Sequence, residues 1–166
     1  MAVNAPADGP VEVLSGQAGE LSWTVSVEGT SEDLYTMLRV SRGGKVLVAG
    51  SGMGGPALYP GTSFSEWRGR TDDLPYFVMA RTVPAADRVV AITDLGLEVE
   101  LALSDPVEQF GLRFAAAALP AGHAPGGIRV EGGSEVLGQQ PQPMPPPPRP
   151  RPFRDGPGRR PLPEPE

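Results

Sequence analysis

Hydrophobic and polar residues alternate strictly in several short stretches of the chain. In Leu21–Val27 the apolar residues at every second position are separated by Ser22, Thr24 and Ser26. A period of two places one row of side chains against a core and the other row in water. This segment therefore predicts a β-strand, and it is the clearest one in the sequence.

Two further runs predict a hairpin. Leu34–Ser41 and Lys45–Ala49 flank the dipeptide Gly43-Gly44, which permits the positive φ angles of a tight turn. We therefore expect antiparallel pairing with apolar partners on a common face. The expected register pairs Val40 with Leu47 and Leu38 with Ala49.

Three more extended runs, Tyr76–Val83, Arg88–Thr93 and Leu97–Leu103, are joined by short polar segments and predict consecutive hairpins. In the last run Glu98 and Glu100 alternate with leucine and valine, so both carboxylates are expected on a solvated face.

Evidence for helix is weak. The alanine run Ala115–Ala118 has high helix propensity, but Pro120 and the glycines after it end the run early. Phe110–Phe114 and Ile128–Val130 are two further strand candidates. About eight short strands separated by Gly, Pro and Asp predict an all-β fold, an antiparallel β-sandwich or barrel.

Proline divides the chain into two parts. Of the 21 prolines, 12 lie in residues 133–166, which contain few large apolar side chains. We expect one β-sandwich-like domain over residues 1–132, with its strands between about Pro10 and Glu131. Residues 133–166 are expected to form a disordered Pro/Arg-rich tail.

Charge follows the same division. Residues 1–132 contain 9 basic and 16 acidic residues, a net charge of −7, whereas residues 133–166 contain five arginines and four acids. An acidic domain repels phosphate backbones, so nucleic acid is not an expected partner.

The scarcity of reactive side chains excludes much enzymology. The chain has no cysteine and one histidine, His123, which removes disulfides, thiol nucleophiles and zinc clusters. Neither a signal peptide nor a membrane span is recognisable in the sequence. We therefore expect a cytoplasmic protein with no membrane partner, no metal and no cofactor.

Residues Gly50–Gly55 match the dinucleotide pattern G-x-G-x-x-G, with Asp72 and Asp73 about 20 residues further on. That motif requires a helix after its last glycine, but Pro56 and Pro60 follow here. We interpret Gly50–Gly55 as a flexible loop whose glycines serve tight turns.

The remaining candidates for catalysis are isolated. His123 lies in a segment with nothing to orient it and is expected to be an exposed loop residue; its sharper interpretation is a weak pH sensor. The acidic pairs Glu32-Asp33 and Asp72-Asp73 lack a surrounding ligand loop and are interpreted as structural. No catalytic residue is assigned.

Trp67 is the best contact candidate of the domain. It lies close to Arg68 and Arg70, and aromatic and arginine side chains dominate binding hot spots. A buried Trp67 that fills the core is the alternative.

The tail carries the other candidate contacts. The segments Pro145–Pro152 and Arg159–Pro163 suggest a polyproline II ligand for a protein partner. The alternative is a solubilising spacer. The arginines concerned are Arg149, Arg151, Arg154, Arg159 and Arg160.

Several segments between Leu38 and Glu131 resemble small β-rich proteins of unknown function that recur in actinobacteria. The segments are RVSRGGKVLVAGSG, WRGRTDD, PAADRVVAITDLGLEVELALS and FGLRFAAAALPAGHAPGGIRVE. The resemblance implies a β-rich fold and brings no activity, ligand or catalytic residue.

These observations favour a non-enzymatic binding or accessory module whose Pro/Arg-rich tail contacts a protein partner. The alternative is a small enzyme or carbohydrate-binding domain that uses Gly50–Gly55, Trp67 and Asp72. The oligomeric state stays open.

Overall fold

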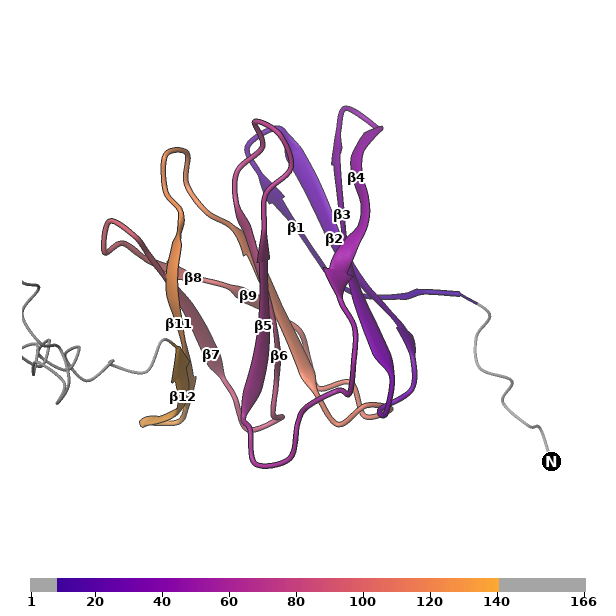
Figure 1. The fold of residues 1–166 in the computed structure, drawn as a ribbon, viewed down its shortest axis with the longest axis vertical. Coiled ribbons are helices and arrows are strands. Elements are labelled where there is room, and N and C mark those ends of the chain that lie inside the picture. Colours follow the sequence, from indigo (N-terminus) through magenta and orange to yellow (C-terminus); the bar gives the residue numbers. More distant parts are fainter. Residues whose placement is uncertain (1–8, 141–166) are drawn as a thin grey trace, which may run out of the picture.

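The strand pattern of the sequence is realised in a computed structural model that describes residues 9–140 (Figure 1). Twelve antiparallel strands in these residues form three sheets of four, and none of the sheets closes into a barrel. The all-β prediction is confirmed, with more strands than the eight expected.

The sheets are built from strands as follows. The first sheet has the order β1 (Val11–Ala18), β2 (Leu21–Gly29), β3 (Leu34–Arg42), β4 (Lys45–Met53). The middle sheet has the order β5 (Phe64–Gly69), β6 (Phe77–Thr82), β10 (Arg113–Ala118), β9 (Ala102–Leu103). The third sheet has the order β12 (Glu135–Gln140), β11 (Pro125–Gly132), β7 (Arg88–Thr93), β8 (Glu98–Glu100).

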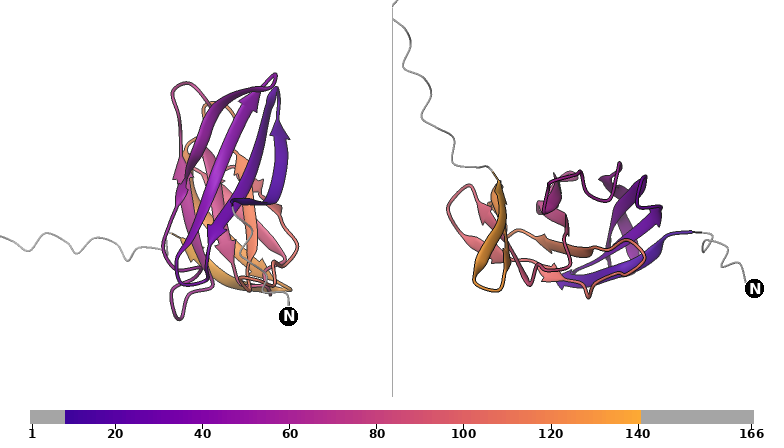
Figure 2. Two further views of the ribbon diagram at one scale, coloured as in Figure 1. Left: turned by 90° about the vertical axis from the view of Figure 1, so that its right-hand side faces the viewer. Right: turned by 90° about the horizontal axis from the view of Figure 1, so that it is seen from below.

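The middle sheet lies between the other two (Figures 1 and 2). All six residues of β6 are buried, because each of its faces packs on a different sheet. Phe77 and Met79 join a core cluster with Trp23 of the first sheet, whereas Val78 joins one with Ile128 of the third. Two apolar layers therefore hold the domain together.

The alanine run lies in the strand β10 of this doubly buried sheet. Ala115 and Ala116 are both buried, and they contribute to opposite core layers. Packing on both faces outweighs the helix propensity of alanine, which is a weak local preference.

The predicted strand Leu97–Leu103 is divided between two sheets. Its first part is β8, which pairs with β7 in the third sheet, and its second part is β9, which pairs with β10 in the middle sheet. Leu101 lies at the division, buried, and its amide donates to the carbonyl of Val89. The β7–β8 hairpin is confirmed. The predicted hairpin of Tyr76–Val83 with Arg88–Thr93 is wrong, because β6 and β7 belong to different sheets.

The predicted register of the β3–β4 hairpin is wrong beyond its turn. Gly43 and Gly44 both have positive φ, as expected, but irregularities follow in the ladder. Val40 therefore pairs with Val48, and Leu38 pairs with Ser51. A β-bulge adds one residue to a strand and shifts every later pair.

The domain extends further than the expected boundary at Gly133. Residues Glu135–Gln140 form β12, which pairs with β11, and Leu137 packs against the second core layer. The hairpin gives this polar segment backbone partners, which composition does not reveal. The rest of the expected tail, residues 141–166, lies outside the described residues.

Within residues 9–140 the fold offers no helix of the length and apolarity needed to cross a bilayer.

Candidate functional site

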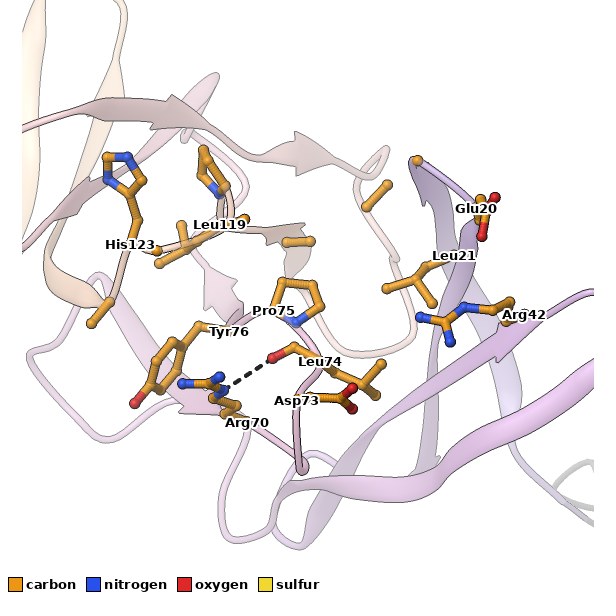
Figure 3. Close-up of a pocket in the computed structure, with 17 residues that line it drawn as sticks. Glu20, Leu21, Arg42, Arg70, Asp73, Leu74, Pro75, Tyr76, Leu119 and His123 are labelled. Atoms are coloured by element: carbon orange, nitrogen blue, oxygen red, sulfur yellow. Dashed lines mark hydrogen bonds between the residues drawn. The ribbon is translucent and has the colours of Figure 1, made fainter.

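An open groove of about 780 Å³ lies at one end of the first and middle sheets (Figure 3). Three connections and one strand end meet there, namely the β1–β2 turn, the β5–β6 connection, the β10–β11 connection and the end of β3. The groove is therefore assembled from parts far apart in the sequence. Its lining residues are Ala18–Leu21, Arg42, Arg70, Asp73–Tyr76 and Ala118–Ala124.

The floor of the groove is apolar. Leu21, Leu74 and Leu119 line it and are nearly fully buried, and Pro75 lies among them (Figure 3). These leucines belong to the packed interior, so the floor is a fixed part of the fold. An apolar floor with charged groups around it is the usual composition of a binding site.

Arg70 is held in place on one wall of the groove. Its Nε donates to the carbonyl oxygen of Leu74 at 3.1 Å, and its guanidinium lies 5.3 Å from the ring centroid of Tyr76 (Figure 3). A cation over an aromatic face is attracted by the ring's quadrupole. Both contacts leave the terminal amino groups of Arg70 available for a carboxylate, whose geometry the guanidinium matches.

The turn before Leu74 gives Arg70 its fixed carbonyl partner. The amide of Leu74 donates to the carbonyl of Thr71 at 3.0 Å, and Asp72 has a φ of 48°. Aspartate tolerates this left-handed conformation better than most residues. The structural interpretation of Asp72 therefore fits the observed turn.

Three other charged side chains border the groove. Arg42 and Glu20 lie on one side, and Asp73 lies between them and Arg70 (Figure 3). All three are exposed, and none of them takes part in an ion pair among residues 9–140. The rim can therefore bind ligand groups of either sign.

His123 is positioned by the fold, contrary to the expectation of an unoriented loop residue. Its side chain is half-buried, and Nδ1 lies 2.9 Å from the hydroxyl oxygen of Thr93, which is buried on β7. The same Thr93 oxygen accepts the amide of Leu97. The sequence could not show this contact, since Thr93 lies 30 residues away.

Trp67 and Arg68 lie outside the groove. Trp67 is half-buried on β5 and packs against the first core layer, with its ring over Gly69. Arg68 is exposed on the other face and forms a 2.6 Å ion pair with Glu66. Of the three contact candidates predicted in the domain, only Arg70 reaches the groove.

Gly50–Gly55 do not form the flexible loop that was expected. Gly50–Gly52 belong to β4, and a Cβ atom at Gly52 would collide with the carbonyl oxygen of Thr36. The hydroxyl of Tyr35 donates to the carbonyl of Gly50 at 2.9 Å. Gly52 therefore allows the close approach of the β3 backbone, which is a structural requirement.

The alternative site of Gly50–Gly55, Trp67 and Asp72 is not assembled. Gly55 lies two residues beyond the end of β4, whereas Asp73 lies in the groove with Arg42, at the end where β4 begins. A strand of this length separates the two places by roughly 25 Å.

The acids on β8 face solvent, as the alternation predicted. Glu98 pairs with Arg129 at 3.0 Å, and Glu100 lies 3.6 Å from Arg88. Both arginines also lie near Glu131, at 3.2 Å from Arg88 and 3.6 Å from Arg129, so two cations partly compensate three acids on this face.

No local sequence pattern indicates that Arg81 is buried. It lies on β6 with 1% of its surface exposed, and it donates to Thr36 Oγ1 and to the carbonyl oxygens of Leu34, Met53 and Pro56. Burial lowers the pKa of its guanidinium below the usual value, and the nearby Tyr59 opposes that shift. Its partners are backbone and hydroxyl oxygens, which indicates a structural role.

The residues 9–140 bring together no group of three or more His, Asp or Glu side chains suited to a metal ion. The predicted contacts Arg149, Arg151, Arg154, Arg159 and Arg160 lie outside the described residues.

Comparisons with protein-family models, curated proteins and solved structures found no match. The resemblance to β-rich actinobacterial proteins stays a prediction.

Proposed function

We propose that this chain is a non-enzymatic binding module that holds an extended segment of a protein partner in the groove. The observation that carries the proposal is Arg70, fixed by Leu74 and Tyr76 above a buried apolar floor. A side chain ordered before binding loses less entropy when its ligand arrives.

The composition of the groove favours a peptide as ligand. An apolar side chain of the partner would lie on Leu21, Leu74 and Leu119, and a flanking carboxylate would meet Arg70. Glu20 and Asp73 would meet backbone amides or basic side chains of the same segment. A central apolar anchor within a polar rim is the common arrangement of protein interfaces.

The Pro/Arg-rich residues provide the second contact in this proposal. Residues 145–160 contain five arginines and one aspartate, whereas residues 1–132 carry a net charge of −7. Contacts through exposed arginines are individually weak and are screened by salt. The tail therefore adds a salt-sensitive contribution to the affinity, whereas the groove supplies the apolar one.

The test is a selection of displayed 12-residue peptides on the full chain. We expect the selected peptides to combine an apolar residue with Asp or Glu. Arg70→Gln should weaken their binding about tenfold, which corresponds to about 1.4 kcal/mol.

Arg113→Gln is the matched control, because Arg113 lies at the opposite end of β10 and donates to the carbonyl of Pro84. Peptides that bind Arg70→Gln and the unchanged chain equally would contradict the groove as the site. If the chain converts a substrate and a groove variant no longer does so, the result would favour the enzyme alternative.

A further inference from the structure

A second surface carries two exposed tyrosines at the other end of the first sheet. Tyr35 on β3 is 39% exposed and Tyr59 in the β4–β5 connection is 61% exposed. A Cβ atom at Gly54 would lie 3.6 Å from the ring of Tyr35, and one at Gly55 would lie 3.5 Å from the hydroxyl of Tyr59. The two aromatic side chains therefore border successive residues of one backbone segment, and we call this the tyrosine surface.

The backbone beneath the tyrosine surface is fixed to the core. The carbonyl of Gly55 accepts the amide of Leu34 at 2.8 Å, and Arg81 donates to the carbonyl oxygens of Met53 and Pro56. Tyr35 is further held by its bond to Gly50. A rigid aromatic platform exposes apolar area without the entropy cost of ordering it on binding.

A tight turn sets the position of Tyr59. The amide and the hydroxyl of Thr62 both donate to the carbonyl of Tyr59, at 3.1 and 2.6 Å. Between them lie Pro60 and Gly61, and Gly61 has a φ of 80°, as a type II turn requires. Tyr59 is therefore exposed on an ordered turn.

Acidic residues surround the tyrosine surface. Glu28 stands directly opposite Tyr35 in the β2–β3 ladder, and Glu32 and Asp33 lie in the turn that precedes Tyr35. In the part of the chain that the structure describes, none of these three acids forms an ion pair. Exposed aromatic rings with adjacent carboxylates match a proline-rich segment that contains arginine.

The chain contains such a segment. Pro145–Pro152 reads PPPPRPRP, with Arg149 and Arg151 as its two charges. Consecutive prolines favour the polyproline II conformation, which docks on aromatic surfaces.

The described part of the chain ends close to the loop that carries Tyr59. The hydroxyl of Ser63 donates to the carbonyl of Leu137 on β12 at 2.8 Å. This contact lies four residues after Tyr59 and three residues before Gln140. Residues 141–144 lead from Gln140 to the segment, and each further residue in polyproline II conformation adds about 3.1 Å of reach toward the tyrosine surface of the same molecule.

We propose that the tyrosine surface is a docking site for the Pro145–Pro152 segment of the same molecule. Tyr35 and Tyr59 contact the prolines, and Glu28, Glu32 and Asp33 attract Arg149 and Arg151. The Glu98/Glu100 face is the weaker attractor, because Arg129 and Arg88 already lie beside its acids. This inference rests on the proposed function in one respect. A protein partner that binds the arginine-rich residues must first displace them from the tyrosine surface.

Paramagnetic broadening in the full chain tests the proposal. Because the chain lacks cysteine, Met144→Cys provides a unique site for a nitroxide next to the segment. We expect the amide signals of Gly54, Gly55 and Tyr59 to lose most of their intensity. The broadening should decrease in about 1 M salt, where the Debye length is about 3 Å.

Two charge-reversal variants of the spin-labelled chain form a matched pair. Arg149→Glu/Arg151→Glu should restore the signals, whereas Arg159→Glu/Arg160→Glu makes the same change of charge outside the segment and should not. Tyr59→Ala, at an exposed position, should restore them as well. Equal effects of the two charge reversals would overturn the assignment of the segment.

Other positions of broadening would also overturn the proposal. Broadening confined to the groove or to the Glu98/Glu100 face would place the segment elsewhere. Broadening in a mixture of isotope-labelled chain and unlabelled spin-labelled chain would assign the contact to a second copy. The peptide selection with Arg70→Gln measures binding in the groove independently of the tyrosine surface. Either proposal can therefore fail while the other holds.

Discussion

Arg81 on β6 donates through Nε to the hydroxyl of Thr36 on β3, at 2.8 Å, and this bond joins the middle sheet to the first sheet. Both side chains are buried, with 1% of their surfaces exposed. The other donors of Arg81 bind the carbonyl oxygens of Leu34 on β3, of Met53 within the Gly50–Gly55 segment and of Pro56 directly after it. One cation thus fixes the backbone beneath the tyrosine surface.

Arg81→Ala should destabilise the domain by about 3–5 kcal/mol, because it leaves four oxygens in or near the core without this donor and opens a cavity. Arg81→Lys should not restore stability, since an ammonium group cannot reach acceptors spread around a planar guanidinium. Thr36→Val should cost only about 1 kcal/mol. Urea unfolding gives these values, and a stable Arg81→Lys variant would contradict the account.

Gly52 and Gly54 form a matched pair for the role of the glycines. Gly52→Ala should cost about 1–3 kcal/mol or more, because its Cβ would collide with the Thr36 backbone. Gly54→Ala makes only an ordinary contact with Tyr35 and should change stability by less than about 0.5 kcal/mol. Thermal unfolding measures both, and equal losses would refute this explanation of Gly52.

Nucleotides should not bind at Gly50–Gly55. Strand β4 includes Gly50–Gly52, and no helix begins after Gly55 within residues 9–140 to present amides to a phosphate. Calorimetry with ATP, GTP and NAD should therefore show no heat of binding. Micromolar affinity that disappears when Gly52 and Gly55 are replaced by alanine would overturn this prediction.

Two truncated chains distinguish the contribution of β12 from the contribution of residues 141–166. A chain that ends at Gln140 should lose salt-sensitive capture of a protein partner, and its melting temperature should fall by at most about 2–4 °C, because only the weak docking of Pro145–Pro152 is removed. A chain that ends at Gly133 also loses β12 and the packing of Leu137 on the second core layer. Its melting temperature should fall by several degrees, at roughly 2–4 °C for each kcal/mol lost.

Circular dichroism and partner capture check the two truncations. Equal melting temperatures for them would show that β12 contributes little. A large fall for the chain that ends at Gln140 would show that residues beyond β12 stabilise the fold.

The sequence determined the strand class wherever one face of a strand is buried and the other is wet. Leu21–Val27 shows this alternation, and it lies within β2 with its apolar residues in the core. The Gly43-Gly44 turn was equally predictable, because only a few residue types tolerate positive φ at both positions. Such signals are local, so a single segment contains all the information they need.

Edge strands gave weaker signals. In β1 a bulge between Glu12 and Leu14 interrupts the alternation, and β12 is mostly polar. Both strands are defined by the neighbour with which they pair. A sequence pattern records which side chains are buried, and an edge strand buries few.

Only the tertiary structure shows which residues are buried between two packed layers. The six residues of β6 show no alternation, because both faces of the middle sheet are covered, and Arg81 is buried there since four oxygens from other segments surround it. The groove likewise exists only in the folded chain, because its floor joins Leu21 with Leu119, whereas the two contacts that position Arg70 are local, four and six residues away. The physical reason is that burial and preorganisation are properties of contacts between distant segments, whereas a sequence pattern reports only the preferences of neighbouring residues.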